Sequence, residues 1–382
     1  MFKLEITHTE GAARTGRLMT ARGDIATPAF MTVSTLGATK GLTLDQVNAA
    51  GAEVILMNAF HLAWRPGEAL IKDLGGLHRF TGWQKPILTD SGGYQIFSLP
   101  GLRKITEEGA HFSSPVNGEL RLFSPETVVE LEAALGADMV MPLDHCPSHT
   151  NTPAEIEAAV ERSIRWAERS RKRWRELNPP NVNLFGIIQG ACDEKLRTRS
   201  VEATCALDLP GYALGGFCVG EANADTRRGI AYSAPLLPAD RPRYLMGMGS
   251  PQDILHSVAS GVDLFDCTLP TRNGRNASVF TSGGRLNLRN ARFARDESPL
   301  DASCACYTCR THSRAYLRHL FLAREMNAAI LTSLHNVAFY LNLMRELRAA
   351  IAAGRFASFK RECEEKLARE DAAPDEGADT ER

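Results

Sequence analysis

The stretch that decides the fold runs from Leu184-Phe-Gly-Ile-Ile-Gln-Gly190 through a helical pattern at 194–207 to Gly211-Tyr-Ala-Leu-Gly-Gly216. Two short apolar runs joined by a helix predict parallel strands that are covered on both faces. Six further runs of this kind predict strands at 26–33, 53–58, 86–90, 138–144, 243–249 and 263–267, and helices are predicted between them at 43–50, 125–135, 153–177 and 251–260. Eight such strands predict a closed (β/α)8 barrel, an α/β fold of about 250 residues. A doubly wound open sheet is the alternative, but no G-x-G-x-x-G motif follows the first strand.

Composition and charge narrow the class of protein. The chain has 382 residues, 44 Lys and Arg against 45 Asp and Glu, and 44% hydrophobic residues, which excludes wholesale disorder. The formal charge of −1 excludes a strongly basic nucleic-acid-binding chain, so an RNA partner would need a local basic patch. No apolar stretch is long enough to span a membrane, and the first ten residues contain no apolar signal core. Nine cysteines, most of them scattered singly, fit a reduced cytoplasm better than a disulfide framework.

The chain is predicted to form a single catalytic domain over 1–382. The barrel takes up about 20–270 and is closed by C-terminal helices, with a long helical pattern from about 314 to 353. A zinc-binding subdomain is expected at about 271–353. The charged segment 361–382 has almost no apolar residues and is predicted to be a disordered tail.

Polar residues follow the predicted strands at their C-terminal ends. They are Asn58, Asp90, Asp144, Gln189, the pair Gly215 and Gly216, and Asp266. A carboxylate at a strand end is often only a turn or cap residue. Six strands ending in this way favour a shared site, because the strand ends of a barrel converge on one mouth.

A cysteine cluster predicts a metal site. Cys304-x-Cys306-x-x-Cys309 places three thiols within six residues, and His335 lies on a later helical pattern. Three cysteines and one histidine form a closed tetrahedral set that suits structural zinc. His312 and His319 compete as the fourth ligand, but both lie close to Cys309 in sequence.

Asp90 and Asp266 are the candidate catalytic carboxylates. Asp90 is followed by Ser91, Gly92 and Gly93, and the two glycines would let a substrate approach the backbone closely. Paired carboxylates are typical of chemistry at a glycosidic bond, where one acts as nucleophile and the other as acid or base. Asp144, Gln189 and Gly216 would match the edge of a guanine-like base, but they would also suit a sugar or an amino acid.

The segment 271–295 is the candidate nucleic-acid surface. It contains six arginines and no acidic residue, and Arg272 and Arg275 come directly after Asp266. Arginine binds phosphates and base edges well, so this segment would hold RNA beside the reacting centre. A second basic run at 169–175 is read as the solvated face of a helix.

Together these residues resemble the bacterial tRNA-guanine transglycosylase family, also called queuine tRNA-ribosyltransferase. The resemblance covers nearly the whole chain. It rests on Asp90-Ser-Gly-Gly-Tyr-Gln95, Ile188-Gln-Gly190, Leu214-Gly-Gly216 with Val219-Gly-Glu221, Phe265-Asp-Cys267 with Pro270-Thr-Arg272, and the cysteine cluster. The chain departs from the family pattern at His145 and Phe217, which adjoin the predicted base pocket, where the family usually has glutamate and leucine.

The resemblance implies a (β/α)8 barrel with a zinc subdomain, one structural Zn²⁺ per chain, and a cytoplasmic homodimer. It also implies a tRNA partner and free guanine and 7-deazaguanine bases as ligands. The reaction would exchange the wobble guanine of GUN-anticodon tRNAs for 7-aminomethyl-7-deazaguanine in queuosine biosynthesis, through a covalent Asp266–ribose intermediate. The incoming base would be a queuosine precursor.

The resemblance assigns a role to each site residue. Asp266 would be the nucleophile and Asp90 the proton acceptor. The substrate pocket would be formed by Ser91, Gly92, Gly93, Tyr94, Asp144, Gln189, Gly215, Gly216 and Met246, with Tyr94 and Met246 stacking on the ring. RNA would contact Gly247, Met248, Gly249, Ser250, Pro251, Gln252, Asp253, Thr271, Arg272, Asn273, Gly274 and Arg275. The zinc ligands would be Cys304, Cys306, Cys309 and His335.

Two other functions use the same features. A glycosidase could use both carboxylates, but it would need neither the arginine segment nor the zinc lobe. A non-catalytic RNA-binding subunit would be expected to lack Asp90 or Asp266, and both are present.

Overall fold

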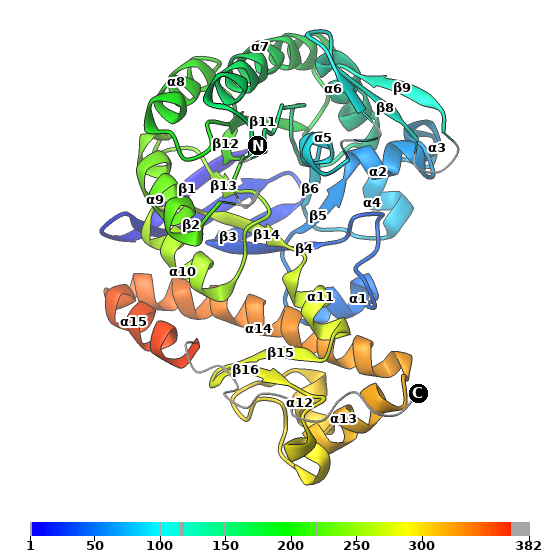
Figure 1. The fold of residues 1–382 in the computed structure, drawn as a ribbon, viewed down its shortest axis with the longest axis vertical. Helices are drawn as coiled ribbons and strands as arrows, with labels where there is room; N and C mark the ends of the chain where they lie inside the picture. Colours follow the sequence, from blue (N-terminus) through cyan, green and yellow to red (C-terminus); the bar gives the residue numbers. More distant parts are fainter. Residues whose placement is uncertain are drawn as a thin grey trace.

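The computed structural model describes residues 2–99, 101, 103–114, 118–148, 150–217 and 221–367. Its centre is a closed barrel of eight parallel strands, which confirms the predicted fold class (Figure 1). The strands follow one another around the barrel in chain order: β4 (Ala29–Val33), β5 (Ile55–Asn58), β6 (Ile87–Asp90), β10 (Met139–Val140), β11 (Asn183–Ile188), β12 (Gly211–Leu214), β13 (Arg243–Leu245) and β14 (Leu264–Cys267). Strand β14 pairs with β4 and closes the ring.

Helices connect the strands and cover the outside of the barrel. They are α1 (Leu44–Ala49), α2 (Ala59–Trp64), α3 (Glu68–Asp73), α4 (Gly76–Thr81), α5 (Gly93–Ser98), α6 (Pro125–Leu135), α7 (Pro153–Leu177), α8 (Glu194–Cys205), α9 (Asn223–Ser233) and α10 (Pro251–Ala259). Helices α6 and α7 begin and end where the sequence predicts. Ser124 and Thr152 cap their first turns, and each helix has proline at its start.

A three-stranded antiparallel sheet covers the N-terminal end of the barrel, and the sequence patterns did not predict it. It consists of β1 (Lys3–Glu10), β2 (Ala13–Thr20) and β3 (Gly23–Thr27). The predicted strand 26–33 is therefore wrong in its extent, because the chain leaves β3 at Thr27 and enters β4 at Ala29. Leu18 and Ile25 pack with barrel residues such as Phe185. This end of the barrel is filled, so a site can open only at the other end.

A second small sheet lies between β6 and α6 in the chain. It consists of β7 (Arg103–Ile105), β8 (Ala110–Ser113) and β9 (Leu120–Phe123). Phe112 and Phe123 pack on Phe60 of α2, with ring centroids 4.8 and 5.3 Å from the Phe60 ring. These aromatic contacts fix the sheet beside the barrel mouth.

A separate lobe follows β14. It contains α11 (Leu269–Arg275), β15 (Ser278–Thr281), β16 (Gly284–Asn287), a 3-10 turn (Ala291–Arg295), α12 (Tyr307–Thr311) and α13 (Arg314–Leu322), and it is followed by the long helix α14 (Met326–Ala352). The long helix predicted at 314–353 is two helices, because the chain turns between α13 and α14 and Arg324 has a left-handed φ of 58°. Helix α14 lies between the barrel and the lobe and contacts both (Figure 1).

The last described helix corrects the predicted tail. Helix α15 (Phe356–Leu367) includes residues 361–367, and the buried Phe356 and Phe359 hold it against the core. The disordered tail was thus predicted to begin too early, and its remainder, 368–382, lies outside the described residues. Cys218, Val219 and Gly220 also lie outside them. None of the helices in the described part of the chain has the length and apolar character of a membrane span.

Candidate active site and metal centre

A cavity of about 500 Å³ opens at the C-terminal ends of the barrel strands. Each of the eight strands, or the loop directly after it, supplies at least one lining residue. The polar residues predicted at the strand ends all line this cavity: Asn58, Asp90, Asp144, Gln189, Gly215, Gly216 and Asp266. Three of the predicted strand-end residues in this cavity are carboxylates.

Asp266 is held by two hydrogen-bond donors on one of its oxygens. The Tyr244 hydroxyl donates to Asp266 Oδ1 at 2.6 Å, and the Gly247 backbone N–H donates to the same atom at 2.7 Å. Burial raises the pKa of Asp266, and these two donors act against that rise because they favour the carboxylate. Oδ2 accepts no hydrogen bond from the described residues, so it is the oxygen that can meet a substrate.

Asp90 has a different environment. Asn58 Nδ2 donates to Asp90 Oδ2 at 2.8 Å. Burial raises the pKa of Asp90 to about 7, and the nearby carboxylates of Asp144 and Asp266 contribute to the rise. A carboxyl group with a pKa near neutrality can both accept and release a proton at working pH.

Asp144 and Gln189 form one hydrogen-bonding unit. Gln189 Nε2 donates to Asp144 Oδ2 at 2.5 Å, and this bond works against the burial that raises the pKa of Asp144 to about 6. Gln189 Oε1 is buried and has no hydrogen-bond partner among the described residues. A buried acceptor without a partner is costly, so this atom is suited to a donor on a ligand.

The Asp144–Gln189 pair leaves no room for a side chain at two neighbouring positions, and both are glycines. A Cβ on Gly93 would lie 1.7 Å from Asp144 Oδ1, and a Cβ on Gly216 would lie 2.2 Å from Gln189 Oε1. Gly216 also has a left-handed φ of +71°. The glycines of both sequence motifs thus make room for the polar pair.

The other predicted pocket residues lie in different surroundings. Tyr94 and Met246 line the cavity, and the Tyr94 side chain is 52% exposed. Ser91 is fully buried outside the lining, where its hydroxyl donates to the Pro142 carbonyl at 2.8 Å. Ser91 therefore ties the end of β6 to the loop after β10. Gly92 lies outside the lining as well, with its φ of 104°.

The first predicted RNA segment forms part of the cavity wall. Gly247, Met248, Gly249, Ser250 and Asp253 line the cavity, and Ser250 caps α10. Pro251 is buried, and Gln252 Nε2 donates to the Leu367 carbonyl at 3.4 Å.

The second predicted RNA segment is helix α11. Arg272 and Arg275 are exposed, and Arg272 lines the cavity. Thr271 is buried, Asn273 is half-buried, and a Cβ on Gly274 would lie 2.7 Å from the Ser333 backbone. Gly274 thus serves the packing of α11 on α14, and the two arginines are the side chains of this segment that face solvent.

Several residues that line the cavity were not predicted as site residues, and Tyr244 and Cys146 are two of them. Tyr244 lies on β13, two positions before Met246, which directly follows the strand, so the period-two alternation of a strand would place both on the inner face. Cys146 also lines the cavity and is 7% exposed.

The two departures from the family pattern differ in their positions. Phe217 lines the cavity, but His145 does not. Arg162 Nη1 lies 2.9 Å from His145 Nδ1, and this nitrogen must accept because arginine only donates. The His145 side chain is thus engaged by α7.

Cys304, Cys306, Cys309 and His335 form a cluster that could hold a metal ion. Their ligand atoms all lie within 4.8 Å of one another. His335 Nδ1 is 3.2 Å from Cys309 Sγ, while His335 Nε2 lies 2.7 Å from the Phe280 carbonyl. If Nε2 donates to that carbonyl, the lone pair of Nδ1 faces the thiols, as a metal-binding histidine requires.

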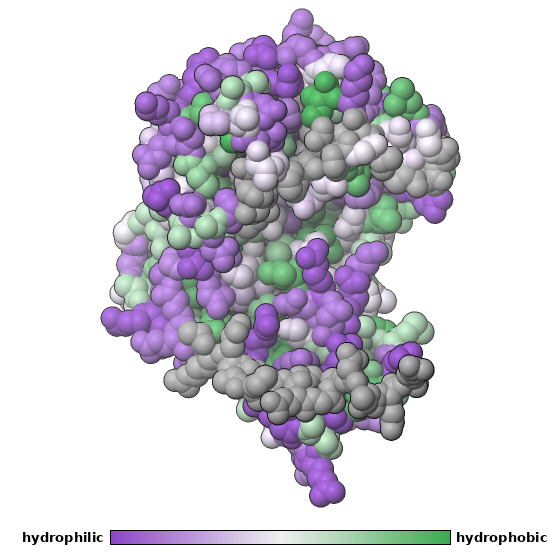
Figure 2. All heavy atoms as spheres, viewed as in Figure 1, coloured by the Kyte–Doolittle hydropathy of each residue, from purple (hydrophilic) through white to green (hydrophobic). Residues whose placement is uncertain are grey.

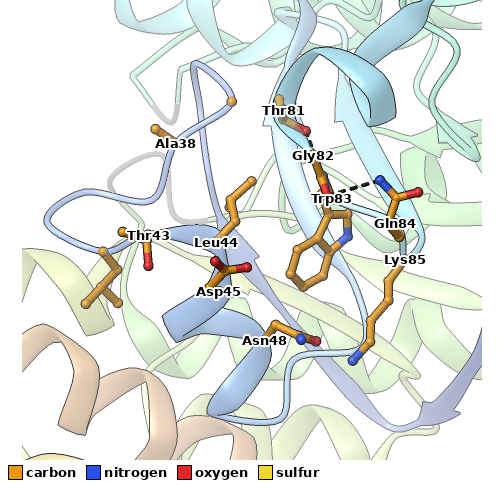
Figure 3. A pocket seen from close by; sticks show the side chains of 12 residues that line it. Ala38, Thr43, Leu44, Asp45, Asn48, Thr81, Gly82, Trp83, Gln84 and Lys85 are labelled. Carbon is orange, nitrogen blue, oxygen red and sulfur yellow. Dashed lines mark hydrogen bonds between the residues drawn. The ribbon is translucent and has the colours of Figure 1, made fainter.

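A larger hollow of about 590 Å³ lies outside the barrel and contains none of the predicted residues. Figure 3 shows it between α1 and the segment that leads into β6. Its Trp83 donates to the Pro86 carbonyl at 3.2 Å, and its Lys85 donates to the Ala52 carbonyl at 2.9 Å. These side chains are used within the fold, and the barrel mouth is the better candidate for chemistry.

The basic run at 169–175 lies on α7, and the sequence predicts it to be the solvated face of a helix. Arg169 pairs with Glu126 at 2.7 Å, and Arg173 pairs with Glu130 at 2.8 Å. Figure 2 shows hydrophilic side chains over the end of the molecule where α7 lies, at the top of the view. Arg169 and Arg173 are thus paired with carboxylates of the neighbouring helix α6.

Comparisons with known proteins point to one family. The family model described as queuine tRNA-ribosyltransferase matches residues 9–369. The queuine tRNA-ribosyltransferase of Nitratidesulfovibrio vulgaris (strain DP4) is 52% identical over 360 residues, which cover 94% of this chain and 96% of that protein. Those of Methylibium petroleiphilum and Shewanella sp. (strain W3-18-1) are each 49% identical, over 365 and 357 residues, and cover 97% and 95% of their own lengths. The matched region contains the barrel, the cavity and the metal site.

Proposed function

The chain belongs to the queuine tRNA-ribosyltransferase family, whose enzymes modify tRNA in the queuosine pathway, and from this premise we propose its reaction. The enzyme exchanges the wobble guanine of GUN-anticodon tRNAs for 7-aminomethyl-7-deazaguanine. The observation that carries this proposal is the arrangement of Asp266, Asp90 and the Asp144–Gln189 unit around one cavity. The exposed Arg272 on the rim of the cavity supports RNA as the larger substrate.

In the first step, Asp266 Oδ2 attacks the C1′ carbon of the wobble guanosine. The bond between C1′ and the base nitrogen breaks, the base leaves with the electron pair, and an Asp266–ribose ester forms. Tyr244 and Gly247 hold the other oxygen of Asp266, so the attacking oxygen is oriented.

In the second step, the incoming base attacks C1′ and displaces Asp266. Asp90 gives its proton to the guanine that departs in the first step, and in the second step the resulting carboxylate accepts the proton that the ring nitrogen of the incoming base loses. Its pKa of about 7 suits both directions. Two inverting displacements retain the configuration of the glycosidic bond, and the RNA backbone is not cut.

Asp144, Gln189, Gly215 and Gly216 would hold the base in plane, since they offer acceptors and donors on one edge of the cavity. Tyr94 and Met246 would stack on its faces. Arg272, Arg275 and the cavity-facing part of 247–253 would hold the RNA.

The metal of the Cys₃His site is proposed to be zinc, one ion per chain. Three thiolates and one imidazole are the donor set of closed structural zinc sites, which stabilise a fold and perform no chemistry. The lobe around the site is small, so a metal would contribute to its folding directly.

A cytoplasmic homodimer is also proposed. Exposed apolar side chains gather on α12, α13 and the start of α14, where Tyr307, Tyr316, Leu322 and Met326 are 52%, 41%, 54% and 82% exposed. Large exposed apolar side chains on neighbouring helices are typical of a protein interface. Sedimentation of the full chain should give a dimer, and Leu322→Glu with Met326→Glu should shift it toward the monomer.

The test of the reaction is incubation with unmodified tRNA and labelled guanine, followed by counting of the base incorporated into RNA. Asp266→Asn should bind tRNA but form no denaturant-stable protein–RNA adduct. Asp90→Asn should retain the nucleophile and lose turnover. If Asp266→Asn still forms the adduct, the nucleophile is another residue, and Asp90 becomes the leading candidate.

A further inference from the structure

Arg197 is a buried arginine beneath the cavity. It lies on α8, its side chain is 1% exposed, and it is not part of the cavity lining. Burial lowers its pKa to about 10, so it stays protonated at neutral pH. Its guanidinium donates to three backbone carbonyl groups: Ala191 at 2.8 Å, Ile188 at 2.9 Å and Gly215 at 2.8 Å.

These contacts clamp the peptide group between Gly215 and Gly216. The Gly215 N–H donates to the Ile188 carbonyl at 3.0 Å, while the Gly215 carbonyl accepts from Arg197 Nη1. A trans peptide is planar, so the Gly216 N–H points away from the Gly215 carbonyl and hence away from Arg197. Both glycines line the cavity, which places this N–H on the cavity side.

The surroundings of Arg197 reinforce the clamp. The Phe217 ring lies over the guanidinium, with 3.9 Å between Arg197 Cζ and the ring centroid. Helix α8 also fixes the neighbouring strand end, because Ser200 Oγ accepts from the Gln189 N–H at 3.1 Å. One helix thus sets both Gln189 and Gly216.

We infer that Arg197 is a positioning residue that aims the Gly216 N–H at the ring carbonyl oxygen of a guanine-type base. The inference rests on the proposed function, which supplies a base with such an oxygen. Lysine cannot replace Arg197 here, because an ammonium group lacks the planar fork that reaches the Ile188, Gly215 and Ala191 carbonyls together.

The experiment compares guanine with 2-aminopurine, the same ring system without the 6-oxygen, by calorimetric titration of the full chain. Arg197→Lys should weaken guanine binding by about 10-fold, the size of one well-placed hydrogen bond. Its affinity for 2-aminopurine should change by less than about 2-fold, because this base has no 6-oxygen to accept from the aimed N–H. Arg199→Lys is the matched control, since Arg199 is exposed on the same helix and pairs with Glu161.

An equal loss for both bases, or no loss for guanine, overturns the inference. If Arg197→Lys does not fold, Phe217→Leu carries the test, because it releases one face of the guanidinium. It should also weaken guanine selectively, and a loss shared equally with 2-aminopurine refutes the role. If the unaltered chain binds neither base, the proposed function itself fails; if it prefers guanine and Arg197→Lys keeps that preference, only this inference fails.

Discussion

Replacing Tyr244 with phenylalanine removes one hydroxyl that bears on the proposed nucleophile. Tyr244 is 1% exposed, and its hydroxyl lies 2.6 Å from Asp266 Oδ1. Burial raises the pKa of Tyr244 well above its usual value, so the hydroxyl remains a donor across the working range. Phenylalanine keeps the ring and its packing. The Gly247 N–H then remains as the second donor to Asp266 Oδ1.

The expected loss of rate follows from the negative charge on the Asp266 carboxylate, which accepts the hydrogen bond from Tyr244. A hydrogen bond to a charged group contributes about 1.5–3 kcal/mol, and about 1.4 kcal/mol corresponds to a factor of ten. Burial already raises the pKa of Asp266, and the Tyr244 hydroxyl is the largest influence against that rise. Without it the pKa of Asp266 rises further, so the reactive carboxylate is lost as pH falls. Base exchange should therefore drop by roughly 10-fold to 100-fold on the acid side and recover as pH rises.

The assay is incorporation of labelled guanine into tRNA, measured as a rate across the pH range. Asp90 titrates in both proteins, so the ratio of Tyr244→Phe to the unaltered chain reports the change at Asp266 together with its effect on the neighbouring Asp90. Tyr212→Phe is the matched control, because Tyr212 is equally buried and its hydroxyl lies 3.1 Å from the Leu209 nitrogen, away from the cavity. A rate ratio for Tyr244→Phe that does not vary with pH would refute this account of Asp266.

Three further predictions concern the lobe. Cys306→Ser should lower the zinc content below one equivalent per chain and lower the unfolding temperature. The control variant Cys363→Ser lies outside the cluster and should change neither quantity. Full stability of the unaltered protein after chelation would contradict a structural metal. Arg275→Ala should weaken tRNA binding and leave the affinity for free base unchanged, because its exposed guanidinium is always charged; an equal loss in both would place it in the base pocket. Asn336→Ala should lower the unfolding temperature and the tRNA affinity together, because the buried Asn336 amide donates to the Pro270 carbonyl at 3.0 Å. The control variant Asn342→Ala should lower neither. Unchanged RNA binding in a destabilised Asn336→Ala protein would show that stability and RNA binding are separate effects.

The barrel and its polar mouth could be predicted because both depend on local patterns. In a parallel barrel the short apolar runs form the strands and the helical patterns form the helices between them. The C-terminal ends of all strands then lie on one side of the barrel. Asp90 and Gln189 could therefore be placed at one site without any knowledge of their distance. The cysteine cluster was equally local.

Other features depend on contacts that no local pattern contains. Strand β1 alternates only weakly between buried and exposed residues, so it gave little strand signal. The break between α13 and α14 depends on Arg324 adopting a left-handed φ, which its residue type does not suggest. Arg197 lies on α8 within an ordinary helical pattern, and its role arises only because strand ends 9 and 18 residues away meet it.

The Cys₃His cluster and helix α11, the proposed RNA-binding helix, contact one short stretch of α14. His335 supplies a metal ligand, while Thr332 Oγ1 donates to the Gly274 carbonyl at 2.7 Å. Asn336 also accepts from the Phe280 N–H at 3.0 Å, and the Phe280 carbonyl lies 2.7 Å from His335 Nε2. A side chain at position 274 would collide with the α14 backbone. Because Gly274 has none, α11 can pack closely against this stretch of α14. A metal bound by this cluster would therefore stabilise the same packing that fixes α11, and in this way a metal outside the cavity would serve the proposed recognition of a large RNA substrate.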